Sequence, residues 1–170
     1  MNKELERIKK PNFYHKIRKI IERLLKKHKS QPIDADFISE AEKNLTPDIS
    51  DHELREILIL SAVSFIEKDP IYDELAKSLL LEKILKEVFQ EEIEEENLNK
   101  NYQKYFPANI RRMIELDIAN PRLLEFDLEK LGSQLVLERD KFFKYLGLET
   151  LYSRYLVKNN KQTLELPQAF

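Results

Sequence analysis

The sequence predicts a mainly α-helical protein of two small helical lobes, with one β-hairpin near its C-terminal end. Three observations support this fold class. The 170 residues include only two glycines, and the chain is rich in Leu, Ile, Glu and Lys, a composition typical of helices. Apolar residues recur at helical spacing over most of the chain, and this period is lost only after Arg154. An acidic stretch that is poor in core-forming residues, 91–100, separates residues 1–90 from residues 101–170.

The composition excludes several kinds of site. The chain has no cysteine, so it can form no disulfide, thiolate metal site or thiol nucleophile. No apolar run is long enough to span a bilayer, and no signal peptide precedes the first charges, so we expect a cytoplasmic protein without a membrane partner. The carboxylates of the acidic stretch follow one another without fixed spacing, and we therefore expect no metal site there.

The charges are distributed unevenly. Residues 1–29 carry eleven Lys or Arg against three Glu, whereas the remaining residues carry eighteen against twenty-eight acidic residues. A basic N-terminal helix is compatible with nucleic-acid binding, but no aromatic platform or known nucleic-acid motif accompanies it. We interpret the basic residues as a solvated helix face that complements the acidic remainder, and expect no nucleic-acid partner.

Four helices with short connections are predicted in the first lobe, an arrangement typical of a small bundle. The first covers residues 13–25, and the second begins near Asp34 or Asp36. The third opens with a capping box, in which the Ser50 hydroxyl accepts from the backbone of Glu53 and the Glu53 carboxylate reaches back. Asp69 is the expected N-cap of the fourth helix, with Pro70 at its first position.

Shorter helices are predicted in the second lobe. Pro107 is expected to open a helix that ends before Asn120-Pro121, and a short helix follows that Gly132 ends. A further helix is predicted after Asp140, with Gly147 interrupting it. Its aromatic residues, and those after it, are expected to face one core.

The only predicted β element is a hairpin near the C-terminal end. Its expected strands, residues 155–157 and 163–165, flank Lys158-Asn159-Asn160-Lys161, in which asparagines tolerate the positive φ of a tight turn. Pro167 suggests a new helix that the sequence does not finish. We expect this element to be completed by further chain or by a partner.

The second lobe resembles a known family. A series of short matches in the right order extends over about seventy residues and is similar to the all-helical N-terminal domain of the ribonucleotide reductase large subunit. The series consists of Asn120-Pro121-Arg122-Leu123-Leu124-Glu125-Phe126, Arg139-Asp140, Tyr145-Leu146-Gly147-Leu148, Thr150-Leu151-Tyr152, Arg154-Tyr155-Leu156 and Leu166-Pro167-Gln168.

The first lobe resembles the latter helices of the ATP-cone, the effector-binding module that precedes this domain in many family members. Its nucleotide-binding hairpin with a Lys-Arg-Asp-Gly signature is missing here, because Lys9-Lys10-Pro11 leads almost directly into the first helix. Asp51 and Arg55 stand where the module has Thr and His. We therefore expect a degenerate cone that has lost ATP and dATP binding. The candidates for a remaining phosphate contact are Lys9, Lys16 and Arg55, for which a solvated face is the competing interpretation.

The resemblance implies a part of ribonucleoside-diphosphate reductase, an oxidoreductase that makes deoxyribonucleotides for DNA synthesis by radical chemistry. The family's catalytic cysteines lie in an α/β barrel that follows this region, so we assign no catalytic residue to this chain. The implied partners are the rest of the large subunit, further large subunits in an oligomer and a radical-generating small subunit. No cofactor is expected in this chain, and the radical source of the whole enzyme, a metal-containing small subunit or cobalamin, stays open.

Two functions are therefore considered. The first is a non-catalytic N-terminal portion of a reductase large subunit, either taken from a longer chain or naturally split, which packs on the catalytic barrel. The alternative is a helical regulatory or adaptor module that binds a protein partner or a nucleotide without catalysis.

Overall fold

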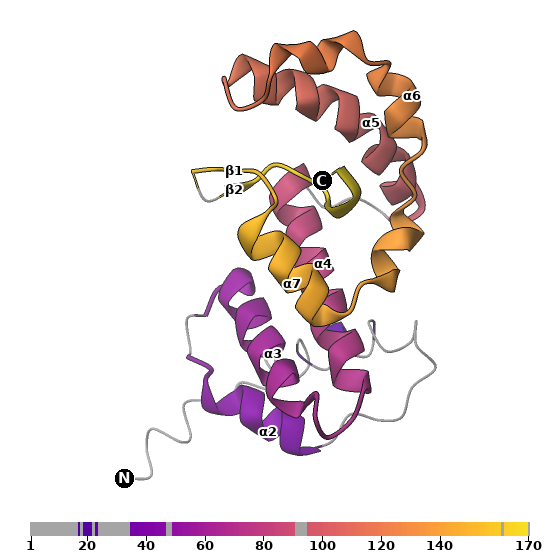
Figure 1. Cartoon of the computed structure of the whole chain (residues 1–170). Helices are drawn as coiled ribbons and strands as arrows, with labels where there is room; N and C mark the ends of the chain where they lie inside the picture. The colour runs from indigo at the N-terminus through magenta and orange to yellow at the C-terminus, as the bar shows by residue number, and fades with distance from the viewer. Residues whose placement is uncertain are drawn as a thin grey trace. The chain divides into compact units, whose positions relative to one another are not determined.

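The computed structural model describes residues 17, 19–21, 23, 35–46, 49–90, 95–160 and 162–169. The chain divides into two compact units, Met1–Leu80 and Leu81–Phe170, and the division falls within helix α4 (Ile71–Phe89). The described part is mainly helical, with one two-stranded hairpin near the C-terminal end (Figure 1). The predicted fold class is confirmed, whereas the predicted domain limits at residues 90 and 100 stay a prediction.

The first unit is built around an aromatic cluster. It contains α2 (Ala35–Lys43), α3 (Asp51–Phe65) and the first half of α4. Phe37 from α2, Phe65 from α3 and Tyr72 from α4 meet with ring centroids 5.2–6.0 Å apart. Such aromatic contacts add to the free energy gained by burying the rings. Ile17 and Ile21, apolar positions of the predicted first helix, are buried too, but the limits of that helix lie outside the described residues.

Local capping sets where α3 and α4 begin. The amide of Glu53 donates to the Ser50 hydroxyl over 3.2 Å, and the Ser50 amide donates to the Glu53 carboxylate over 2.9 Å. The predicted capping box is therefore confirmed. Before α4, the Asp69 carboxylate accepts from the amide of Ile71 over 2.8 Å, in the N-cap role that the sequence predicts.

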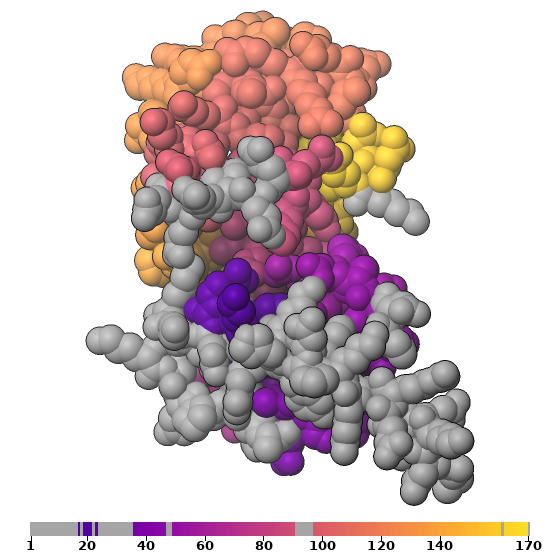
Figure 2. Space-filling model, turned by 180° about the vertical axis from the view of Figure 1, so that it is seen from behind, coloured from indigo at the N-terminus to yellow at the C-terminus, as the bar shows by residue number. Residues whose placement is uncertain are grey.

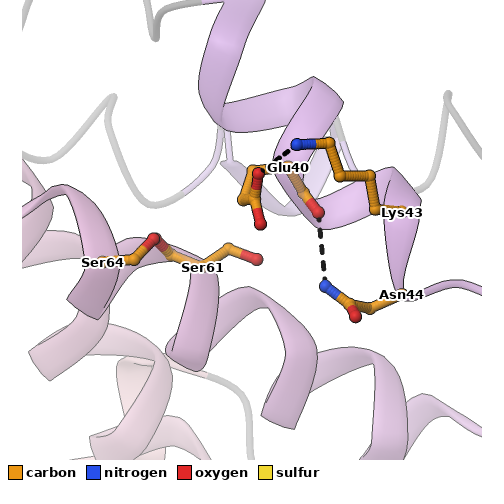
Figure 3. A network of polar contacts seen from close by, with 5 residues as sticks. All are labelled: Glu40, Lys43, Asn44, Ser61 and Ser64. Atoms are coloured by element: carbon orange, nitrogen blue, oxygen red, sulfur yellow. Dashed lines mark hydrogen bonds and ion pairs between the residues drawn. The ribbon is translucent and has the colours of Figure 1, made fainter.

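Figure 3 shows polar contacts in the C-terminal turn of α2, together with Ser61 and Ser64 of the neighbouring α3. Lys43 pairs with Glu40 over 2.6 Å, and the Asn44 amide donates to the Glu40 carbonyl over 3.4 Å. On α3, the Ser64 hydroxyl donates to the Ser61 carbonyl over 2.8 Å. Because the Glu40–Lys43 pair is exposed, it adds little to stability, although Lys43 complements the negative end of the α2 dipole.

The second unit consists of the second half of α4 and the elements after it. These are α5 (Glu95–Glu115), η1 (Pro121–Glu125), α6 (Leu128–Ser133), η2 (Leu137–Phe142), α7 (Tyr145–Arg154), β1 (Lys158–Asn159), β2 (Gln162–Thr163) and η3 (Pro167–Ala169). One of its apolar clusters is formed by Ile110 and Met113 of α5, Leu128 of α6 and Leu164. The C-terminal segment therefore shares a core with α5 and α6.

Helix α5 corrects one prediction, because Pro107 lies inside it and does not open it. Pro107 has no N–H and cannot donate to the carbonyl of Gln103, one turn earlier. At this point α6 packs closely against α5, and the Gln103 side chain donates to the carbonyls of Ser133 and Leu135 over 3.1 and 2.9 Å. These contacts hold α5 in place at a residue that would otherwise end a helix.

The region around Asp140 corrects a second prediction. Asp140 lies inside the 3-10 helix η2, and the chain is extended at Phe143 and Lys144 before α7 begins. Gly147 therefore lies in the first turn of α7 and does not interrupt a helix. Because of this break, the aromatic residues no longer lie on one face of a single helix. Phe142 is therefore 84% exposed and does not face the core.

The predicted hairpin is present, with shorter strands closer to the turn. Lys158 pairs with Thr163 and Asn159 with Gln162, and Asn160 has a φ of 48°. Asparagine tolerates this left-handed conformation better than most residues. After the hairpin, residues 163–167 are all buried, so the C-terminal segment runs through the interior of the second unit.

Candidate functional site

The structure describes one of the three candidate phosphate-binding residues. Lys9 and Lys16 lie outside the described residues. Arg55 lies on α3, is 9% exposed and already has interaction partners within the protein. A phosphate contact at these residues stays a prediction.

Among the residues that the structure describes, no cluster of three or more His, Asp or Glu side chains could hold a metal ion. In the same part of the chain, no helix combines the length and the apolar character needed to cross a bilayer.

The most developed polar arrangement of the second unit is a network around Gln168, on η3. The Gln168 side chain donates to the carbonyl of Val136 over 2.7 Å and accepts from its amide over 3.2 Å, much as a neighbouring strand would. It also donates to the Asp140 carboxylate over 2.8 Å. The backbone amide of Gln168 donates to the hydroxyl of Tyr102 over 3.2 Å. One glutamine thus joins η3 to η2 and α5.

The carboxyl group of Asp140 is the electrostatically unusual member of this network. It is fully buried, and its Oδ2 atom has no hydrogen-bond partner. Burial raises the pKa of Asp140 to about 6, and the hydrogen bonds from Gln168 and Tyr102 oppose this shift only in part. Burial also raises the pKa of Tyr102, because a phenolate would be costly there.

A second polar network attaches the hairpin to the second half of α4. The Glu87 carboxylate accepts from the hydroxyls of Tyr152 and Thr163 over 2.9 and 2.6 Å. Its backbone carbonyl accepts from the Gln162 side chain over 3.1 Å. The ammonium group of Lys158 lies 3.9 Å from the centroid of the Tyr152 ring, in a cation–π contact. This network fixes the position of the hairpin relative to α4 and α7.

Both networks hold the fold together, and neither presents an open reaction site. Asp140, Tyr102 and Thr163 are fully buried, so no ligand can reach them in this conformation. Neither network could be predicted from the sequence, because each joins residues that lie far apart in the chain. The pairing of Asp140 with Gln168 is not visible in local spacing, because 28 positions separate the two residues.

Fold and site together define a class: a helical domain whose buried polar side chains anchor its own C-terminal segment. Comparisons with known proteins narrow this class. The chain is 32% identical over 127 residues to the ribonucleoside-diphosphate reductase subunit alpha of Chlamydia pneumoniae, and 34% identical over 130 residues to that of Chlamydia muridarum. It is also 58% identical over 45 residues to the subunit alpha of Helicobacter pylori.

The shared region is most of this chain but a small part of its relatives. Each chlamydial match covers 75% of this chain and 12% of the relative. The match to H. pylori covers 26% of this chain and 6% of the relative. No protein-family model matches. The predicted resemblance is confirmed: this chain is related to a segment of the large subunit of ribonucleoside-diphosphate reductase.

Proposed function

We propose that this chain is an N-terminal, non-catalytic portion of a ribonucleotide reductase large subunit. The observation that supports it is the match over 75% of the chain to reductase alpha subunits of which it spans only 12%. In this proposal, the complete cytoplasmic enzyme reduces ribonucleotides to deoxyribonucleotides for DNA synthesis. The chain itself provides a helical support that packs on the catalytic barrel.

The arrangement of the second unit is consistent with a supporting role. Its buried polar groups are used to anchor the hairpin and η3, through Glu87 and Gln168. Because the chain has no cysteine, the radical-carrying and electron-delivering cysteines of the enzyme would belong to the rest of the subunit. In this proposal the radical generator, a metal-containing small subunit or cobalamin, lies outside this chain.

The coding sequence around the chain tests this proposal. We expect an open reading frame beyond Phe170, or a neighbouring gene, to encode a barrel with cysteines spaced for ribonucleotide reduction. Co-purification of that product with the chain, and reduction of a ribonucleoside diphosphate by the assembled enzyme, would then be measured. A stop codon after Phe170 with no cysteine-bearing complementary gene contradicts the proposal, and favours the adaptor alternative.

A further inference from the structure

We propose that residues 116–131 of the second unit form a docking surface for the part of a large subunit that lies outside the matched segment. These residues are called the 116–131 surface. The inference rests on the proposed function and names the surface through which the chain would act.

Five of the nine exposed large apolar side chains among the described residues lie on the 116–131 surface. Phe126 is 62% exposed and Leu124 is 53% exposed. Three further residues of the segment have more than a third of their surface in solvent: Leu116, Ile118 and Leu131. In the space-filling view, the salmon and orange atoms of this region form an outer face of the second unit (Figure 2). Clustered exposed apolar residues mark interaction surfaces more often than scattered ones do.

The backbone of this segment is held in place at each of its turns. At the end of α5, Asp117 takes a φ of 58°, and the amides of Ile118 and Ala119 donate to the carbonyl of Met113 over 2.8 and 3.1 Å. This is the pattern of a helix-ending αL turn. The side chains of Asn120 and Asp127 then cap η1 and α6, accepting over 2.9 and 3.0 Å.

The same backbone decides which apolar side chains face inwards. Ala119 and Leu123 pack against the cluster of Ile110, Met113, Leu128 and Leu164. Leu124 and Phe126, on the same short stretch, remain exposed. Their exposure therefore results from a fixed local structure in which the core positions are already filled.

The charges of this region favour a protein partner. Arg122 pairs with Glu125 over 3.5 Å, and Arg111 pairs with Glu129 over 2.8 Å. Residues 111–131 contain four cations and five acidic residues, so they lack the excess positive charge that nucleic acid or an anionic membrane requires. Apolar side chains next to paired charges are typical of a protein–protein interface.

The length of the relatives identifies the occupant. The matched segment is 12% of each chlamydial subunit, so most of such a subunit lies outside it and has to contact the segment somewhere. Among the described residues, each of the five large apolar side chains of the 116–131 surface keeps more than a third of its surface exposed. We therefore assign them to contacts with the remainder of a large subunit.

A binding experiment tests this assignment. The 170-residue chain is titrated against C. pneumoniae subunit alpha from which the matched segment has been deleted, and the dissociation constant is measured by calorimetry. We expect Leu124→Ser combined with Phe126→Ser to raise this constant at least tenfold. Leu60→Ser, which replaces a 66%-exposed leucine on α3, is the control and should leave it unchanged. Circular dichroism melts should be alike for all three proteins.

The outcomes separate the surface from the proposed function. If the unsubstituted chain fails to bind the truncated subunit, the proposed function is contradicted together with the docking surface. If it binds and the double variant binds equally well, only the docking surface is wrong. If the unsubstituted chain forms a dimer that the double variant abolishes, in sedimentation experiments without the truncated subunit, a second copy is the occupant and the assignment is overturned.

Discussion

At the scale of single residues, Asp140 combines full burial with an oxygen atom that has no hydrogen-bond partner. Its proton is held more tightly in the folded protein than in the unfolded chain, because burial raises the pKa from 3.8 to about 6. The neighbouring charge of Glu138 raises the pKa further, and no cationic side chain contributes to the shift. An ionised Asp140 is therefore a cost to the folded state at neutral pH.

We expect Asp140→Asn to stabilise the protein at pH 7.5 by about 1–3 kcal/mol. Because the folded-state pKa of Asp140 is raised, its contribution to stability is most favourable below pH 4. This contribution is lost as the pH rises towards and through 6. The amide keeps an oxygen that can accept from Gln168 but has no charge to bury. Urea unfolding of both proteins at pH 4, 5, 6 and 7.5 measures the difference.

The gap between Asp140→Asn and the unsubstituted protein should close as the pH falls towards 4. Glu138→Gln is the control, because Glu138 is exposed and acts on Asp140 only through its charge. A destabilised Asp140→Asn protein with the same deficit at every pH would show that the carboxylate is needed for its hydrogen bonds, contrary to this prediction.

The sequence was informative where a residue acts on its immediate neighbours. The capping box of Ser50 and Glu53 spans three positions and could be predicted, since the backbone amides of a helix start always need acceptors. The pairing of Gln168 with Asp140 depends on how η3 folds back onto η2. Spacing along the chain contains no information about such a contact.

At the scale of elements, the contact between α5 and α6 depends on a glycine. A Cβ atom at Gly132 would lie 2.7 Å from the carbonyl oxygen of Gln103 and 3.1 Å from a ring carbon of Pro107. The first distance is to backbone, which cannot move aside without shifting α5. Gly132 thus permits a close approach of the two helices where the sequence predicted only a helix end.

We expect Gly132→Ala to destabilise the protein by about 1–3 kcal/mol, because the added methyl group overpacks the contact between α6 and α5. Gly147→Ala is a matched control, since its Cβ would meet only a ring carbon of Phe143 at 3.8 Å. In the first turn of α7, alanine should stabilise the helix by up to about 1 kcal/mol. Thermal unfolding measures both, and a stabilised Gly132→Ala protein would contradict the close approach.

The errors of the element predictions have a common cause. The intrinsic preferences of Pro107 and Gly147 favour positions at helix ends, and the predictions for both residues rest on these preferences. In the structure, the packing of α6 against α5 keeps Pro107 inside a helix. The extended residues Phe143 and Lys144 already separate η2 from α7, so Gly147 lies within α7 and ends no helix. The hairpin was predicted correctly because its turn residues determine it locally.

At the scale of the whole molecule, we propose that the first unit is a degenerate cone without effector binding, because the sequence lacks the glycine-containing hairpin signature. Arg55, the one described candidate for a phosphate contact, is largely buried. A buried and partnered guanidinium is poorly placed to receive a nucleotide from solvent. The burial of Arg55 therefore supports the proposal of a degenerate cone.

We expect no measurable binding of ATP or dATP by the 170-residue chain in isothermal titration calorimetry. The physical reason is that a phosphate site needs converging donors, and the sequence lacks the glycine-containing hairpin that supplies them in the family. Micromolar affinity for either nucleotide would contradict this prediction. In that case, loss of binding in Lys9→Ala and Lys16→Ala variants would assign the site.

The burial of residues 163–167 has a consequence for the folding of the protein during its synthesis on the ribosome. Thr163 bonds to Glu87 across 76 positions, and Gln168 bonds to Tyr102 across 66. Helices α4 and α5 therefore leave the ribosome long before the residues that complete their packing have been synthesised. Until then Asp140 lacks its glutamine partner, and the cluster of Ile110 and Met113 lacks Leu164. The second unit should thus reach its final packing only as its last residues emerge, in contrast to a domain that folds from its N-terminal end.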